Sequence, residues 1–245
     1  MRKIVAIGGG SMVEGATAAI DAEIIKFSGK KTPTALFIPT ASGDNLDYCK
    51  NFRRVYSEKF GCRTDSLLLL KGKPPVKTIR EKIFNADIIY VGGGNTLMMM
   101  RRWRLLGVDK LLIQTCQQGK VMAGVSAGAI CWFQFGHSDS EFYYHPENWD
   151  WIRVRGLGIL PFTACPHYLK EHRDKHFQNM IKNKGGIGLA LDDCSAIQVL
   201  GNQFRILHSN KEARAFRVYR KKGAVRNELL PASPQFQSLK SLENI

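Results

Sequence analysis

The sequence has few long hydrophobic runs and no paired cysteine motif. Its six cysteines show no C-x-x-C spacing, so neither a zinc site nor a dithiol redox centre is indicated. Several lie in apolar segments, where free thiols in a reducing cytoplasm are expected rather than disulfides. The run Leu67-Leu68-Leu69-Leu70 ends at Lys71, and no apolar stretch approaches the length of a membrane span. The N-terminal apolar segment is too short for a signal peptide and predicts a first core strand. Together these absences favour a cytoplasmic protein.

Complete nucleotide-binding and nucleic-acid-binding motifs are also missing. The segment Gly8-Gly9-Gly10-Ser11-Met12-Val13 lacks the last glycine of G-x-G-x-x-G, and no Walker pattern occurs. The net charge of +15 arises from 36 basic and 21 acidic residues, but these charges are scattered. Without a zinc finger, helix-turn-helix or RNA-recognition signature, we expect no specific nucleic-acid partner, whereas anionic peptides remain possible ligands. His172 and His176 lie four residues apart without an evident third ligand, so no metal site is predicted.

The first two-thirds of the chain alternates strand patterns with helix patterns. Apolar runs predict buried parallel strands at residues 3–7, 34–38, 66–70, 87–91 and 121–125. Helices are expected at residues 15–27, 44–60, 76–85 and 95–118, the last broken near Leu106-Gly107. This order predicts an α/β fold with a doubly wound, mostly parallel sheet in three layers, flavodoxin-like, whose functional site lies at the carboxyl ends of the strands.

The pattern changes after Trp132. Residues 135–160 are polar and aromatic and indicate an excursion beside the site, followed by a strand at 163–165 and a helix at 171–182. Antiparallel strands are expected at 187–191, 196–200, 203–207 and 213–219, with a hairpin turn at Gly201-Asn202. The polar tail after Pro231 is expected to fray. No internal repeat or linker divides the chain, so residues 1–245 are interpreted as one domain with a C-terminal antiparallel β extension.

The most informative motif is Gly124-Val125-Ser126-Ala127-Gly128, which has the form G-x-S-x-G. An apolar strand precedes it and a small-residue helix start follows it, and this setting is typical of a nucleophile elbow. The flanking glycines are needed where the two arms of such a turn pass close together. An ordinary tight strand-to-helix turn that contains serine is the alternative. The motif favours Ser126 as a nucleophile.

A nucleophilic serine needs a base and an acid that orients the base. His167 is the best of six histidines, because it follows a short apolar strand and so is expected on the same rim as Ser126. Asp192 and Asp193, which follow another apolar strand, are the candidate acids; a polar turn is the alternative. The resulting order Ser, His, Asp differs from the α/β-hydrolase order.

A second glycine-rich turn, Val91-Gly92-Gly93-Gly94-Asn95-Thr96, links a strand to a helix. Its N–H groups can form an oxyanion hole, while Asn95 or Thr96 caps the helix. Turns of this kind also bind phosphate, so the turn alone leaves both ligands open.

Taken together, the motifs resemble those of the peptidase E / cyanophycinase family of serine peptidases, whose fold is similar to that of class I glutamine amidotransferases. The resemblance runs from about Arg2 to about Tyr219. It rests on five segments in the family's order: Phe37-Ile38-Pro39-Thr40-Ala41, residues 91–96, residues 124–129, Pro166-His167 and Gly188-Leu189-Ala190-Leu191-Asp192-Asp193.

The resemblance implies a role for each matching residue. Ser126 matches the nucleophile, His167 the general base and Asp193 the acid, where the family usually has glutamate. The oxyanion hole is implied at Gly94 and Ala127, with Gly93 beside them. The substrate side is implied at Asn95 and Asp139.

The implied activity is hydrolysis of short peptides without a metal or organic cofactor, by a monomer or a homodimer. Val125 stands where peptidase E has tryptophan, so a strict preference for an N-terminal aspartate is not implied. Two alternatives remain: an inactive relative that binds an anionic small molecule or peptide, and a cyanophycinase-like hydrolase of an acidic polymer. Amidotransferase chemistry needs a cysteine at the elbow, where this chain has Ser126.

Overall fold

A computed structural model describes residues 1–244. Five parallel strands form one side of an eight-stranded sheet: β1 (Lys3–Ile7), β2 (Thr34–Ile38), β3 (Arg63–Ser66), β4 (Ile88–Val91) and β5 (Val121–Val125). They lie in the order β1-β5-β4-β2-β3. Three antiparallel strands extend the sheet beyond β1, namely β10 (Ser195–Leu200), β11 (Gln203–His208) and β14 (Gln237–Ser238). The predicted parallel sheet is confirmed, and the expected strands at 196–200 and 203–207 extend it with a hairpin. The expected strands at 187–191 and 213–219 are not part of this extension, because they belong to a second sheet, in which the first of them pairs in parallel with one neighbour.

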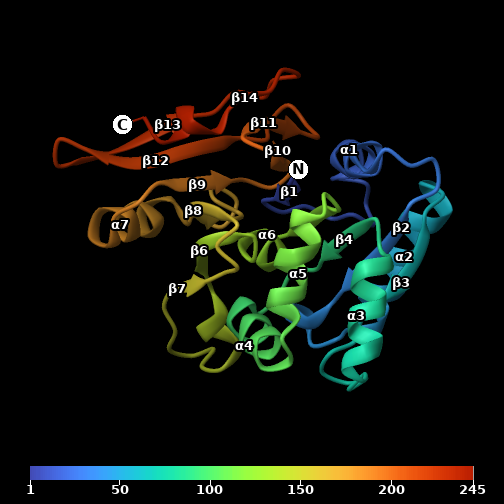
Figure 1. The fold of residues 1–245 in the computed structure, drawn as a ribbon. Coiled ribbons are helices and arrows are strands. Elements are labelled where there is room, and N and C mark those ends of the chain that lie inside the picture. Colours follow the sequence, from blue (N-terminus) through green and yellow to red (C-terminus); the bar gives the residue numbers. More distant parts are fainter. Residues whose placement is uncertain (245) are drawn as a thin grey trace.

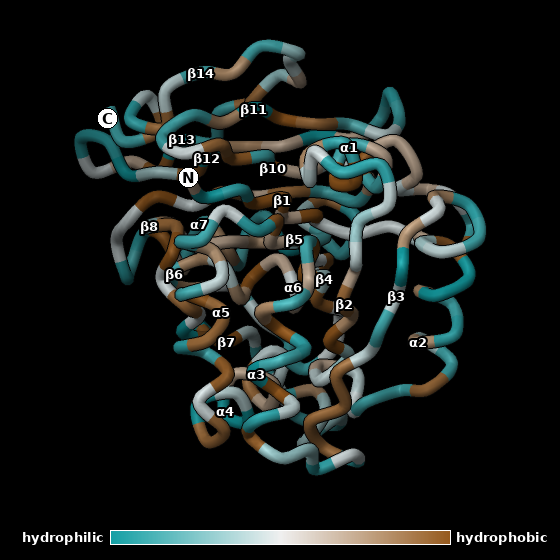
Figure 2. The backbone as a smooth tube through the Cα atoms, turned by 45° about the vertical axis from the view of Figure 1, so that its right-hand side comes forward, coloured by the Kyte–Doolittle hydropathy of each residue, from teal (hydrophilic) through white to brown (hydrophobic). Residues whose placement is uncertain are grey.

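Helices cover both faces of this sheet. Side chains of α1 (Ala18–Ser28), α2 (Leu46–Arg53) and the π-helical turn Arg54–Lys59 form one core with the strands. The opposite core includes α3 (Val76–Asn85), α4 (Thr96–Leu106), α5 (Val108–Gln117) and α6 (Ala127–Ile130). The expected break between α4 and α5 lies at Gly107, whose φ of 70° ends α4. Figure 2 shows hydrophobic residues gathered along central strands such as β1 and β2. The doubly wound arrangement is therefore confirmed.

A second, six-stranded sheet was not predicted. It has the order β13-β12-β9-β8-β6-β7, in which the pairs β9–β8 and β8–β6 are parallel and the other pairs are antiparallel. Its strands are β6 (Phe133–Ser138), β7 (Ile152–Arg155), β8 (Leu160–Cys165), β9 (Gly188–Leu191), β12 (Ala215–Lys221) and β13 (Ala224–Leu229). Helix α7 (Asp174–Lys184) packs on it beside the long β12–β13 hairpin (Figure 1). The expected excursion thus contains a strand pair, β6 and β7, joined by the η3 turn Ser140–Tyr143.

The expected strand at residues 66–70 is wrong. The strand is the polar segment Arg63–Ser66 at the sheet edge, and the leucines that follow lie outside it. Leu67 and Leu69 are buried, but the N–H groups of Leu70 and Lys71 donate to the Asp44 carboxylate, at 2.5 and 2.9 Å, instead of to a neighbouring strand. The leucines are therefore apolar because they are buried as part of a loop, and this apolar run was mistaken for a strand.

The expected fraying of the tail is also wrong. After Pro231 the chain adds β14 to the first sheet and then forms a short 3₁₀ helix, Leu239–Leu242. Leu239 and Leu242 are 4% and 2% exposed and belong to the largest core cluster. Two apolar side chains anchor this otherwise polar segment.

No helix within residues 1–244 is long and apolar enough to cross a membrane.

Candidate active site

Ser126 lies at the carboxyl end of β5 in a strained backbone conformation. Its φ of 56° and ψ of −116° are rare for a residue with a side chain. The strain is held in place because the Ser126 N–H donates to the Ile7 carbonyl at 3.0 Å. On the other side, the Ser126 carbonyl accepts from the N–H groups of Ala129 and Ile130, at 2.9 and 3.0 Å. The half-buried hydroxyl is thus presented at a sharp strand-to-helix turn.

The two glycines of the motif are required by close packing. A Cβ on Gly124 would lie 2.3 Å from the Gly128 carbonyl oxygen. A Cβ on Gly128 would lie 2.1 Å from the Val91 carbonyl oxygen, at the end of β4. Both distances are far inside van der Waals contact, and the opposing atoms are backbone. The G-x-S-x-G spacing therefore follows from how tightly α6 passes β5 and β4.

The turn after β4 lies against the serine. The Cβ position of Gly93 is 3.3 Å from the Ser126 Cβ. Gly94 has a φ of +131°, and a Cβ there would meet the Ala41 carbonyl oxygen at 2.3 Å, so no other residue fits. Within residues 1–244, the N–H groups of Gly94 and Ala127 donate to no protein acceptor. Unpaired N–H groups beside a presented hydroxyl are the donors that a developing oxyanion needs.

Asn95 and Tyr48 support this turn. The Asn95 N–H donates to the Ala41 carbonyl at 2.8 Å, and its side-chain oxygen caps α4 by accepting from the Met98 N–H at 2.9 Å. With 3% of its surface exposed, Asn95 presents little to a ligand. Burial raises the pKa of Tyr48, and the Gly93 N–H beside its hydroxyl acts in the opposite direction. Sequence reasoning missed Tyr48, because a tyrosine in an amphipathic helix carries no local signal of this contact.

His167 and Asp193 form a hydrogen-bonded pair. His167 Nδ1 lies 2.6 Å from Asp193 Oδ1, and His167 is itself strained at a φ of 52°. The hydrogen bond from His167 is the main effect that lowers the pKa of Asp193, and partial burial opposes it. Asp192 is engaged elsewhere, because its carboxylate accepts from the N–H groups of Leu169 and Lys170, at 3.3 and 3.0 Å. Asp193 is therefore the acid that contacts the ring, while Asp192 holds the loop that carries it.

The end of β1 connects this pair to the serine. Ile7 accepts the Ser126 N–H, and two residues later Gly9 forms a parallel bridge with Asp193. A Cβ on Gly9 would lie 1.9 Å from Asp193 Oδ1 and 2.4 Å from the His167 ring. Ser126, His167 and Asp193 are thus all in contact with the carboxyl end of β1 or the loop that follows it. Among the described residues, the Ser126 hydroxyl makes no hydrogen bond to His167, and catalytic contacts of this kind often tighten only when substrate binds.

Glu171 and Arg173 are further members of the site that the sequence did not reveal. Glu171 Oε1 lies 3.9 Å from His167 Nδ1, and Glu171 Oε2 accepts from Arg173 Nε at 2.9 Å. Arg173 is 2% exposed, lies 3.7 Å from an oxygen of Asp139 and stacks on Trp151 at 4.2 Å. Arg173 thereby joins the His167 loop to the Asp139 loop. Residues 170–175 are all charged or histidine, a composition typical of a solvent-exposed surface, so nothing in the sequence indicates that Arg173 is buried.

His176, unlike the exposed His172, is half-buried and contacts a buried histidine. Its Nδ1 lies 2.9 Å from His137 Nε2, and its Nε2 lies 3.3 Å from Asp150. His137 is fully buried, and burial is the main effect that lowers its pKa to about 2. Within residues 1–244, no three or more histidine, cysteine, aspartate or glutamate side chains are grouped as metal ligands.

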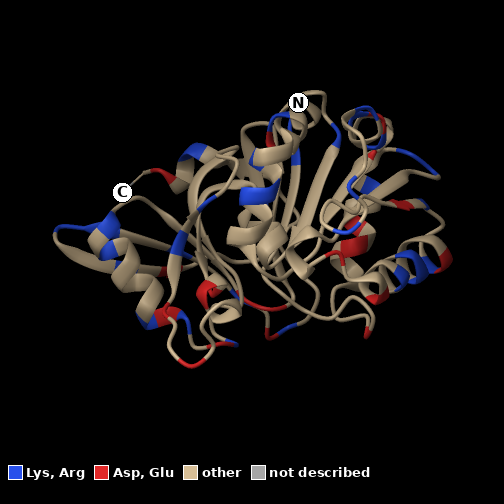
Figure 3. Ribbon diagram, turned by 90° about the horizontal axis from the view of Figure 1, so that it is seen from below, with Lys and Arg blue, Asp and Glu red and all other residues tan. Residues whose placement is uncertain are grey.

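Charge is not concentrated at one face of the fold. Figure 3 shows Lys and Arg spread over many elements and interspersed with Asp and Glu. The excess of 36 basic over 21 acidic residues is thus distributed along the chain.

Comparison with known proteins identifies similar chains. The model of peptidase family S51 matches residues 4–207. The uncharacterized peptidase YgaJ of Bacillus subtilis (strain 168) is 36% identical over 222 residues, which cover 89% of this chain and 92% of that protein. A probable alpha-aspartyl dipeptidase of Drosophila melanogaster is 25% identical over 78% of this chain and 79% of its own length.

Solved structures share the fold. The structure of a peptidase from an acI-B1 actinobacterium superposes with a TM-score of 0.75 at 20% identity, covering 97% of both chains. A putative peptidase E from Listeria monocytogenes EGD-e gives a TM-score of 0.64 at 20% identity, covering 85% of this chain and 98% of that one.

Proposed function

The chain belongs to peptidase family S51, and we propose that it is a serine peptidase that hydrolyses short peptides with Ser126 as nucleophile. The observation that carries the proposal is the strained Ser126, next to Ala127 and to the turn of Gly93 and Gly94, at the carboxyl ends of β5 and β1, where a histidine and an aspartate also form a hydrogen bond. A turn with only a structural role would not need a strained serine, unpaired N–H groups and a histidine hydrogen-bonded to an aspartate in the same place.

The mechanism gives each group one role. His167 Nε2 accepts the Ser126 proton, and Ser126 Oγ attacks the peptide carbonyl. Asp193 keeps Nδ1 protonated and stabilises the imidazolium that forms, since its carboxylate accepts from that nitrogen at 2.6 Å. The oxyanion develops against the N–H groups of Gly94 and Ala127, with Gly93 beside them.

His167 then protonates the leaving amine, and water hydrolyses the acyl-enzyme by the reverse proton path. No step requires a metal or an organic cofactor.

Of the two residues expected on the substrate side, a direct substrate contact is proposed at Asp139, and Asn95 is proposed to act by holding the turn beside Ser126. Asp139 is the more accessible, with 31% of its side chain exposed, whereas Asn95 is occupied as a helix cap. Because the dipeptidase relative is only 25% identical, its preference for aspartyl peptides is a hypothesis here that the substrate library must test. We place the protein in the cytoplasm, where its six free cysteines stay reduced.

Hydrolysis of a di- and tripeptide library, followed by mass spectrometry, tests the proposal. Wild type is compared with Ser126→Ala and with Ser57→Ala, a control in the π-helical turn. Loss of the nucleophile is expected to lower the rate by several orders of magnitude, about 10⁶-fold in the best-studied case, while the control cleaves normally. Equal cleavage by Ser126→Ala contradicts the assignment. Binding of anionic peptides without cleavage by any variant favours the non-catalytic alternative, and cleavage of branched acidic polymers alone favours the cyanophycinase-like one.

A further inference from the structure

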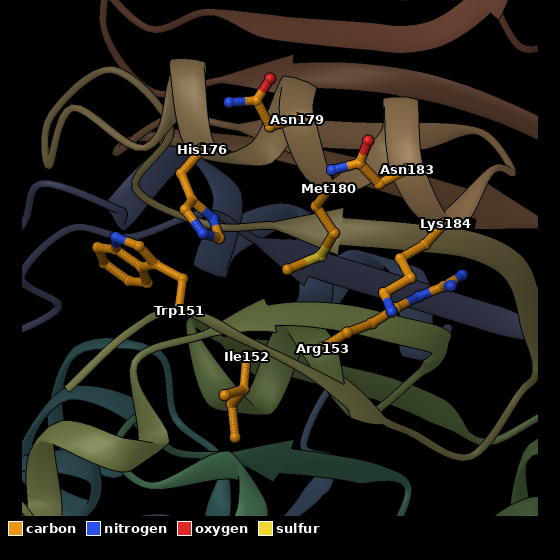
Figure 4. Close-up of a pocket in the computed structure, with 8 residues that line it drawn as sticks. All are labelled: Trp151, Ile152, Arg153, His176, Asn179, Met180, Asn183 and Lys184. Atoms are coloured by element: carbon orange, nitrogen blue, oxygen red, sulfur yellow. The ribbon is translucent and has the colours of Figure 1, made fainter.

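A cavity of about 440 Å³ lies between β7 and α7, apart from Ser126, His167 and Asp193. Figure 4 shows side chains from both elements directed into it. The apolar part of its lining is Trp151 and Ile152 on the β7 side and Met180 on α7. The size lies within the range of small-molecule sites, about 300–1,000 Å³, and such sites combine an apolar lining with a few polar groups.

Arg153, on β7, is a cation without a counter-ion. Its Nε is buried and has no hydrogen-bond partner within residues 1–244, and its Nη2 makes only a 3.5 Å contact to Thr163 Oγ1. One face of the guanidinium is covered by the Phe135 ring at 3.7 Å. Desolvation lowers the pKa of Arg153. A half-buried guanidinium is normally paired, so an unpaired one that lines a cavity indicates a missing anionic partner.

Lys184, at the end of α7, adds a second cation to the same cavity. Figure 4 shows Lys184 and Arg153 on the same side of the cavity, opposite Trp151. Within the part of the chain that the structure describes, Lys184 also forms no ion pair. Asp150, which precedes Trp151, lies 3.3 Å from His176, and within residues 1–244 it forms an ion pair with neither cation.

The Trp151 ring, part of the apolar lining, is held in place by its neighbours before any ligand binds. The Trp151 ring stacks on His137, with centroids 4.7 Å apart and planes 25° apart. Arg173 covers the same indole at 4.2 Å. A rigid aromatic surface costs little ordering entropy when a ligand packs on it.

From these contacts we propose that the cavity between β7 and α7 binds a small organic carboxylate with an apolar body. The carboxylate pairs with Arg153 and Lys184, because a guanidinium offers two parallel N–H groups to a carboxylate. The apolar body packs on Trp151 and Met180. Inorganic anions carry the charge but lack the apolar part. The site is independent of the catalytic assignment.

Binding is tested with phenylacetate and N-acetyl-L-leucine as probes, phenylacetamide as the uncharged control and inorganic phosphate as the simple anion. Calorimetry gives the affinities, and the Trp151 indole N–H resonance, assigned with Trp151→Phe, reports the location. We expect both carboxylates to bind and to shift this resonance, with phenylacetamide and phosphate at least about tenfold weaker.

Variants separate this site from the active site. Arg153→Met and Lys184→Met are each expected to weaken both carboxylates by about tenfold or more, whereas Ser126→Ala leaves binding unchanged. Arg153→Lys keeps the charge, and partial recovery of affinity supports the pairing even if Arg153→Met folds poorly. The proposal is overturned if no carboxylate shifts the Trp151 resonance, if the amide or phosphate binds equally well, or if both cation variants bind like wild type.

Discussion

Replacing Asp193 by asparagine tests the link between the histidine and its acid. The Asp193 carboxylate accepts from His167 Nδ1 at 2.6 Å, a charge-assisted hydrogen bond that fixes the ring tautomer. An asparagine retains the shape but not the charge, and its amide nitrogen can turn toward Nδ1 and favour the wrong tautomer. His167 Nε2 then carries a proton and cannot accept one from Ser126. The equivalent substitution in a well-studied serine peptidase lowers kcat by about 10⁴-fold.

For this chain we expect kcat to fall by about 10³- to 10⁴-fold, which corresponds to about 4 to 5.5 kcal/mol of lost transition-state stabilisation. KM is expected to change little, because the carboxylate lies behind the ring. Steady-state kinetics on a peptide from the library gives both constants. The labelling rate of Ser126 by a fluorophosphonate gives the nucleophile's reactivity without a known substrate.

Asp192→Asn is the matched control. Its side-chain oxygen can still accept from the N–H groups of Leu169 and Lys170, so the loop is retained and kcat is expected to fall by less than about tenfold. If Asp192→Asn is the more damaging variant, the two acids have been assigned in the wrong order. If Asp193→Asn stays within about tenfold of wild type, adding Glu171→Gln decides whether the carboxylate 3.9 Å from the ring replaces it.

Three further predictions concern stability. Burial is the main effect that raises the pKa of Asp21 to about 6, so the folded state binds an extra proton between about pH 4 and 6 and loses stability as pH rises through this window. Asp21→Asn is therefore expected to stabilise the fold at pH 7 by up to about 3 kcal/mol and to give no gain below pH 4, as urea unfolding across pH will show. Gly128→Ala is expected to destabilise by at least about 3 kcal/mol, because its Cβ would lie 2.1 Å from the Val91 carbonyl oxygen; Gly158→Ala, where no atom lies within 4 Å, costs only about 1 kcal/mol, and equal melting temperatures would contradict the clash. Leu242→Ala is expected to cost about 2 kcal/mol in the same unfolding assay, whereas a frayed tail would show no change.

The fold was predictable where burial is continuous along an element. Strands β1, β2, β4 and β5 are buried on both faces and gave unbroken apolar runs, so their positions were predicted to within a residue. Strand β3 was misplaced because it is a polar edge strand. The second sheet could not be predicted, because its strands come from segments far apart in the chain and no local pattern encodes their pairing.

The candidate site was predictable only where backbone geometry restricts residue type. Gly124, Gly128 and Gly94 stand where a Cβ has no room, so they form motifs that can be read locally. Glu171 and Arg173 depend instead on how the loop after β8 folds onto Trp151. Whether a charged side chain is buried depends on residues that pack against it from other parts of the chain, so the local sequence does not reveal it.

The glycine-rich segment after β1 resembles a phosphate-binding loop in composition, but its glycines make room for side chains of the protein itself. Such loops commonly bring backbone N–H groups to a phosphate, and the missing last glycine argued against that use here. A Cβ on Gly8 would meet the Asp192 carbonyl oxygen at 2.3 Å, and one on Gly9 would displace both His167 and Asp193. The space beside Gly9 is therefore filled by the Asp193 and His167 side chains. Because Ile7, just before this segment, also accepts from the Ser126 N–H, the end of β1 contacts all three residues of the proposed triad, Ser126, His167 and Asp193.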